Sequence, residues 1–162
     1  MAFAAAMLLG ATSCSDFLEE DNKTGETAEL TYSTNTGIDG LLASAYSYQR
    51  GWYGKEPALG LTEGGTDLFY YGFDNKQKSM NSYNITSVSL AENVSDNPCL
   101  DEYWEMGYAG VDVCNNLIKY AAINADLTET GKKEYIGQGL FLRALTYFNM
   151  VNMWGAIPYN AE

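Results

Sequence analysis

The sequence predicts a mainly α-helical protein built from tetratricopeptide-like helical hairpins, together with a long irregular loop region rich in aromatic residues. Three observations predict this fold. Apolar residues recur at helical spacing in three segments, a short turn joins the last two segments, and the region 51–97 between the first two has no sustained period. With 162 residues, 46% of them hydrophobic, the chain has enough apolar side chains to form a buried core.

The first segment, 1–13, is an uncharged run of small and apolar residues that precedes Cys14. It is typical of the apolar core of a signal peptide and is too short for a membrane span, which needs about 20 apolar residues. Because Ala11 to Cys14 resembles a bacterial lipobox, we expect Cys14 to be the lipid attachment site. The alternative is a buried N-terminal helix with an incidental cysteine. The polar, acidic segment 14–35 has no period and predicts a tether and peripheral wrap.

A first helix is predicted over 37–50. Thr36 is expected to cap it, with Asp39 completing a near capping box, and the apolar spacing is kept by Ile38, Leu41, Leu42, Ala45 and either Tyr46 or Gln49. The region 51–97 that follows is rich in Gly, Ser, Asn and aromatic residues, so it predicts a long loop with at most one short helix around 59–68.

Two further helices are predicted over 100–122 and 129–154, joined by a turn in which Thr128 caps the second one. The apolar face of the first is expected to hold Trp104, Gly107, Tyr108, Val111, Cys114 and Ile118. The buried stripe of the second is expected to hold Ile136, Leu140, Ala144, Phe148 and Val151. Gly155 and Pro158 end this helix. Two long helices joined by a short turn form the hairpin unit of helical-repeat proteins.

Composition narrows the classes of function. Nine basic and 21 acidic residues give a net charge of -12, which repels nucleic acid. The sequence has no histidine, so it lacks the commonest general base and transition-metal ligand, and we predict neither a metal site nor a cofactor. Cys99 and Cys114 are expected to remain unlinked, because 15 residues on one helix separate them by about 22 Å. Only a loop that folds Cys99 back would allow a disulfide.

The aromatic loop region carries the hypothesis of a ligand site. Flat rings stack on the apolar faces of sugars, and neighbouring Asn and Asp side chains hydrogen-bond to hydroxyl groups. The candidate ligand-binding residues are Trp52, Tyr53, Phe69, Tyr70, Tyr71, Phe73, Asp74 and Tyr83. The competing interpretation is that several of these rings anchor the loop. No catalytic residue is predicted, because the acidic pairs Glu63 with Asp67 and Glu102 with Glu105 are more typical of a solvated helix face than of a glycosidase.

The segment from Tyr135 to Pro158 carries a recognisable motif, with a Phe-Leu-Arg-Ala run, a Tyr-Phe pair and a closing Gly-x-x-Pro. It resembles the SusD/RagB family of starch-utilisation-system outer-membrane lipoproteins. The residues that match are Phe141, Leu142, Arg143, Ala144, Tyr147, Phe148, Gly155 and Pro158. Gln138 and Gly139 depart from the Glu and Ala of the family pattern, and Gly139 costs a helix about 1 kcal/mol relative to alanine. Arg143 is expected to join an ion pair or to hydrogen-bond to loop carbonyl groups, rather than to contact ligand.

The resemblance extends to the lipidated start at Cys14, the Glu63 to Asp67 segment, and the helix that holds Trp104 and Asn115. It implies a surface-exposed outer-membrane lipoprotein, membrane-bound through its lipid, that captures oligosaccharides or other nutrients and delivers them to a SusC-like TonB-dependent transporter. Family members are about three times longer, so 36–162 is expected to be a partial, N-terminal helical-repeat domain. The alternatives are a helical-repeat adaptor that binds proteins without a sugar site and, less well supported, a hydrolase.

Overall fold

The computed structural model describes residues 27–69 and 98–161, and these residues form five α-helices without a β-strand. The predicted mainly α-helical fold is therefore confirmed. The helices are α1 (Ala28–Tyr32), α2 (Asn35–Tyr53), α3 (Glu56–Glu63), α5 (Pro98–Ile123) and α6 (Glu129–Trp154). Cys14 and the proposed signal peptide lie outside the described residues. None of the helices in the described ranges has the length and apolar character needed to span a membrane.

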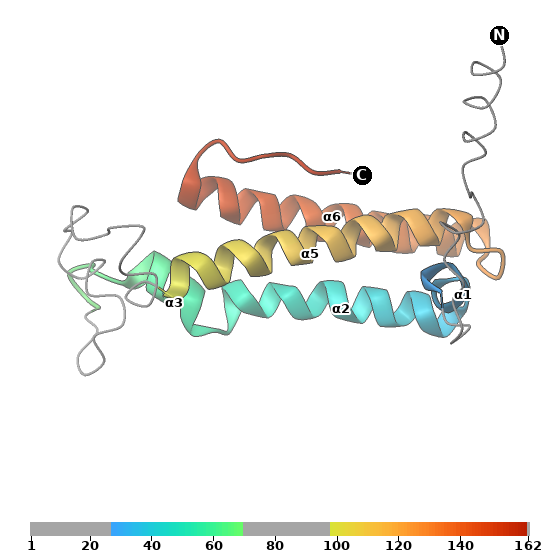
Figure 1. The fold of residues 1–162 in the computed structure, drawn as a ribbon, viewed down its shortest axis with the longest axis horizontal. Helices are drawn as coiled ribbons and strands as arrows, with labels where there is room; N and C mark the ends of the chain where they lie inside the picture. The colour runs from blue at the N-terminus through green and yellow to red at the C-terminus, as the bar shows by residue number, and fades with distance from the viewer. Residues whose placement is uncertain (1–26, 70–97, 162) are drawn as a thin grey trace, which may run out of the picture.

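The three long helices α2, α5 and α6 lie side by side along the long axis of the molecule (Figure 1). α5 runs in the opposite direction to both α2 and α6, and each of the three contacts the other two. The short helices lie at opposite ends of this bundle, α1 near the start of α2 and α3 near the start of α5 (Figure 1). The predicted α5–α6 hairpin is thus one side of a three-helix arrangement.

Some helices begin at other positions than the sequence predicts. Thr34, and not Thr36, caps α2, because its Oγ1 accepts the backbone N–H of Gly37 at 3.1 Å. The predicted short helix at 59–68 is α3, which begins earlier, with a proline in its first turn. Helix α1 was not predicted from the sequence. It is only five residues long, and Thr27 caps it by accepting the N–H of Leu30 at 3.1 Å.

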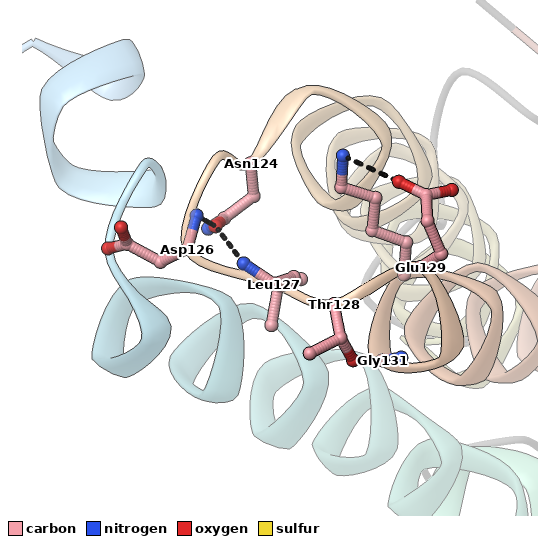
Figure 2. Close-up of polar contacts among 7 residues, drawn as sticks. Asn124, Asp126, Leu127, Thr128, Glu129 and Gly131 are labelled. Carbon is pink, nitrogen blue, oxygen red and sulfur yellow. Dashed lines mark hydrogen bonds and ion pairs between the residues drawn. The ribbon is translucent and has the colours of Figure 1, made fainter.

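The turn between α5 and α6 is held by two side chains that accept backbone N–H groups (Figure 2). Asn124 is 1% exposed, and its Oδ1 accepts from the backbone of Asp126 at 2.9 Å and of Leu127 at 3.1 Å. Thr128 caps α6 as predicted, with its Oγ1 accepting the N–H of Gly131 at 3.1 Å. These bonds satisfy donors that would otherwise lack partners at the turn and at the start of the helix.

The main hydrophobic core lies where α2, α5 and α6 meet. Its buried members are Ile38, Leu41, Ala45, Cys114, Leu117, Tyr120, Ala121 and Leu142. The spacing predicted for the first helix is confirmed at Ile38, Leu41 and Ala45, and the face predicted for the second at Gly107, Val111 and Cys114. No disulfide joins Cys99 and Cys114, both of which are buried, in agreement with the prediction.

The predicted buried stripe of α6 holds only at Ile136, which is partly buried against the core, and is wrong at its other four positions. Leu140, Ala144, Phe148 and Val151 are all exposed, and the buried face instead consists of Gly139, Leu142, Thr146, Asn149 and Met150. Apolar side chains occur on two faces of this helix, so their period alone does not decide which face turns inward.

Small and polar residues select the buried face of α6. Gly139 lets α6 approach α5 closely, since a Cβ there would lie 2.9 Å from Cγ1 of Ile118. Thr146 accepts a hydrogen bond of 2.9 Å from Nε2 of Gln49 on α2. Close backbone approach and polar pairing therefore decide the orientation of this helix, and they leave a row of large apolar side chains on its outer face.

Candidate functional site

A shallow pocket lies at the end of the bundle where α2 passes into α3. Its volume is about 400 Å³, and it is lined by Trp52, Tyr53, Gly54, Lys55, Glu56, Leu59 and Thr62. The last turn of α2 supplies the two rings, and α3 supplies most of the opposite wall. Because α2 ends at Tyr53 and α3 begins at Glu56, the short connection between them places aromatic, charged and hydroxyl groups around one hollow.

Trp52 and Tyr53 differ in how firmly the fold holds them. Trp52 is half-buried, and its ring packs against that of Tyr103 on α5, with centroids 5.1 Å apart and planes inclined by 49°. The side chain of Tyr53 is 66% exposed. The pocket therefore combines one ring fixed by packing with one that is open to solvent, an arrangement that suits a flat, partly apolar ligand.

Tyr103 supports Trp52 from inside the bundle. It is only 3% exposed, and its other neighbour is Trp154 of α6, whose ring lies 5.9 Å away and nearly parallel, at 8°. Burial disfavours the phenolate and raises the pKa of Tyr103 to about 12, so its hydroxyl stays protonated at neutral pH. The pocket wall at Trp52 is thus backed by the packed rings of Tyr103 and Trp154.

The rings behind the pocket continue as a row across the molecule. Each ring contacts the next with centroids 5.1 to 6.5 Å apart, in the order Trp52, Tyr103, Trp154, Trp104, Tyr108, Tyr147 and Tyr159. Sequence reasoning missed this row. Its members come from α2, α5, α6 and the segment that follows α6, and no periodic signal in the sequence connects them.

The structure describes only part of the predicted ligand site. Trp52 and Tyr53 lie together in the pocket, whereas Phe69, which is 36% exposed, is not among the residues that line it. The other five candidates lie outside the described residues; they are Tyr70, Tyr71, Phe73, Asp74 and Tyr83. Their role stays a prediction.

Arg143 of the Phe-Leu-Arg-Ala motif hydrogen-bonds to a loop carbonyl oxygen, which is one of the two kinds of contact predicted for it. Its Nη1 donates to Oδ1 of Asn115 at 2.8 Å and to the carbonyl oxygen of Ala161 at 3.4 Å. Nδ2 of Asn115 in turn donates to the carbonyl oxygen of Asn160 at 3.3 Å. The motif thus fastens the segment after α6 onto the helical hairpin, which the sequence pattern alone did not show.

The acidic residues of the two candidate carboxylate pairs lie at the surface. Glu63, Asp67, Glu102 and Glu105, the residues of the two candidate carboxylate pairs, are all exposed. No group of three or more possible metal ligands is found within the described residues.

The described residues thus form a helical-hairpin fold with a pocket that two aromatic side chains help to line. A profile of the SusD-like family, described as "Starch-binding associating with outer membrane", matches residues 16–162. The chain therefore belongs to the SusD-like family, as the resemblance of its motifs predicted.

Two curated relatives come from Formosa agariphila. SusD-like protein P2 is 26% identical over 158 residues, which cover 94% of this chain and 29% of the relative. SusD-like protein P25 is 25% identical over 166 residues, covering 96% of this chain and 30% of the relative. The chain thus spans less than a third of the length of these relatives. No solved structure gives a significant match.

Proposed function

We propose that this chain is part of a cell-surface protein that binds glycans without chemically altering them. The observation that carries the proposal is the pocket at the α2–α3 junction, where Trp52 and Tyr53 face a hollow in a chain of a family described as starch-binding. The oligosaccharide stacks its apolar ring faces on these two side chains. Its hydroxyl groups hydrogen-bond to Lys55 and Glu56 at the rim.

The packing of Trp52 favours binding. Its ring is already held against Tyr103, so a bound sugar does not have to immobilise it, and less conformational entropy is lost on binding. Tyr53 adapts to the ligand, because most of its side chain is exposed. Capture by such a pocket is reversible, and no bond in the ligand is made or broken.

We further propose how the longer protein is anchored and where it delivers its ligand. A lipid on Cys14 anchors it at the outer membrane with its binding surface outside the cell, and the captured oligosaccharide passes to a SusC-like TonB-dependent transporter. The family's description as associating with the outer membrane and the lipobox-like residues Ala11 to Cys14 support this setting.

One observation favours a second function, that of a helical-repeat adaptor for another protein. Large apolar side chains lie exposed on the outer face of α6, with Leu140 at 45%, Phe148 at 64% and Val151 at 48% exposure. Exposed apolar patches of this kind mark surfaces that contact proteins. An adaptor would need this face and would not need Trp52 or Tyr53.

The test is binding of the full chain to a panel of oligosaccharides, starting with fragments of starch, with product analysis of the same mixtures. We expect binding without turnover, and a loss of about tenfold in affinity, equal to about 1.4 kcal/mol, for Tyr53→Ala and for Trp52→Ala. Phe148→Ala is the matched control, because it removes a similarly exposed ring that does not line the pocket.

The outcomes separate the alternatives. Unchanged affinity in both pocket variants would reject the site, and the absence of binding to every glycan in the panel would reject the function. Product that disappears when Glu63 or Glu102 is changed to Gln would show a hydrolase instead. Thermal unfolding of each variant establishes that lost binding does not reflect lost folding.

A further inference from the structure

A second hollow, separate from the pocket at Trp52, lies between α6 and the segment that follows it. Its volume is about 450 Å³, and it is lined by Leu140, Arg143, Ala144, Tyr147, Val151, Ile157 and Tyr159. The first five lie on one face of α6, and Ile157 and Tyr159 form the opposite wall. We call this hollow the α6 groove.

The outer wall of the α6 groove is held in place. Gly155 has a φ of 76°, a backbone conformation that glycine adopts more readily than other residues. After Gly155 the chain turns back along α6 (Figure 1). The hydroxyl of Tyr108 donates to the carbonyl oxygen of Pro158 at 2.8 Å. The hydroxyl of Tyr147 donates to the carbonyl oxygen of Asn160 at 2.9 Å and accepts its N–H at 2.7 Å. The groove is therefore formed before any ligand arrives.

The charge in the α6 groove is unlike that of the rest of the chain. The net charge of the protein is -12, yet Arg143 is the one charged residue among those that line the groove. Within the described residues the guanidinium group has no carboxylate partner, and both of its hydrogen bonds there use Nη1. Three N–H donors, on Nε and Nη2, remain for another acceptor.

We propose that the α6 groove binds a small carboxylate ligand that carries an apolar or ring-shaped body. A guanidinium fork matches a planar carboxylate with two parallel hydrogen bonds, which are stronger than bonds between neutral groups. The rings of Tyr147 and Tyr159, with centroids 5.2 Å apart, and the side chains of Leu140 and Val151 contact the body of the ligand. This site is additional to the proposed glycan pocket.

A carboxylate fits the α6 groove better than a phosphate. The groove offers one cation, Arg143, between mostly apolar walls. The second negative charge of a phosphate would lose its hydration there without gaining a positively charged partner. The surrounding net charge of -12 adds to that cost. Carboxylates of this kind occur in sugar acids and at the ends of peptides, and the two sources share the chemistry that Arg143 recognises.

The test uses the full chain and two matched pairs of probes. N-acetylphenylalanine is compared with its uncharged amide, and glucuronate is compared with glucose, by calorimetry and by NMR of the backbone amides of Ile157 and Tyr159. We expect at least one acid to bind about tenfold or more tightly than its neutral partner and to shift these two amides. The pair that shows the preference identifies the source of the carboxylate.

Substitution of Val151 tests the site without touching the contacts that hold the outer wall. Val151 is 48% exposed and lines the groove about two helical turns from Arg143, so Val151→Glu adds a negative charge to the groove wall, and Val151→Gln is its uncharged control of similar size. We expect Val151→Glu to bind the acid at least about tenfold more weakly than Val151→Gln. Equal binding by the two variants, equal binding of acid and neutral probes, or tighter binding of phenyl phosphate than of either acid would overturn the proposal.

Discussion

Replacing Gly139 with alanine sets two opposing effects against each other in the middle of α6. Alanine is favoured over glycine in a helix interior by about 1 kcal/mol. Helix propensity alone therefore predicts that Gly139→Ala stabilises the protein. The structure predicts the opposite sign, because Gly139 is buried against α5.

The magnitude follows from the atoms that the new methyl group would meet. A Cβ at Gly139 would lie 2.9 Å from Cγ1 of Ile118, 3.4 Å from Cδ2 of Leu117 and 3.5 Å from the carbonyl oxygen of Cys114. Cγ1 of Ile118 is next to a branched carbon, and a β-branched side chain in a helix has few alternative rotamers. Overpacking of this kind costs about 1–3 kcal/mol. Subtracting the gain in helix propensity leaves a net destabilisation of about 1 kcal/mol.

The assay is urea unfolding followed by circular dichroism, with Gly137→Ala as the matched control. Gly137 lies on the same helix and is exposed, and a Cβ added there would have no other atom within 4 Å, so its substitution gains helix propensity alone. The difference between the two variants, about 1–3 kcal/mol, then isolates the packing cost. In the Ile118→Ala background, Gly139→Ala should destabilise the protein less than it does in the original sequence, because the atom closest to the new Cβ is gone.

The reasoning is refuted if Gly139→Ala raises the free energy of unfolding by as much as Gly137→Ala does. That result would mean that α5 and α6 separate slightly at no cost and that Gly139 does not set their distance. An unchanged effect of Gly139→Ala in the Ile118→Ala background would refute the assignment of the clash to Ile118.

Three further predictions concern buried groups. Burial raises the pKa of Tyr103 to about 12. Above pH 10 the unfolded chain therefore releases a proton that the folded chain retains. The free energy of unfolding falls as a result, by up to about 1.4 kcal/mol per pH unit, until pH 12. Urea unfolding between pH 9 and 12 should show this decline, and Tyr103→Phe should reduce it. Asn124→Ala removes the two hydrogen bonds that Asn124 Oδ1 accepts at the α5–α6 turn, and it should lower the free energy of unfolding by about 2 kcal/mol in the same assay at pH 7. A loss near zero would show that water replaces these bonds. Burial also raises the pKa of Cys114 to about 11, so mass spectrometry after treatment with a thiol reagent at pH 8 should find Cys114 labelled only in unfolded protein.

Local sequence signals predicted the helices well where propensity and caps agreed. The bounds of α6 match the predicted 129–154, because Thr128 caps its start and Gly155 ends it. The predicted start of α2, residue 37, lies two residues after the observed start at Asn35. Thr34 and Thr36 are equally good caps in the sequence. In the structure Thr34 is the cap, and the backbone of α1 lies directly against Gly37. The family motif from Tyr135 to Pro158 was also readable without a structure.

The sequence by itself determined the helical hairpin, the absence of a disulfide between Cys99 and Cys114, and the family, because each depends on local spacing or on a contiguous motif. It also placed Trp52 and Tyr53 among the candidates for a ligand site, since their setting is local. Only the tertiary structure decided which face of α6 is buried, because the close approach at Gly139 and the bond between Gln49 and Thr146 outweigh the apolar pattern. The aromatic row and the α6 groove arise from residues far apart in the chain, so they exist only after the helices have packed.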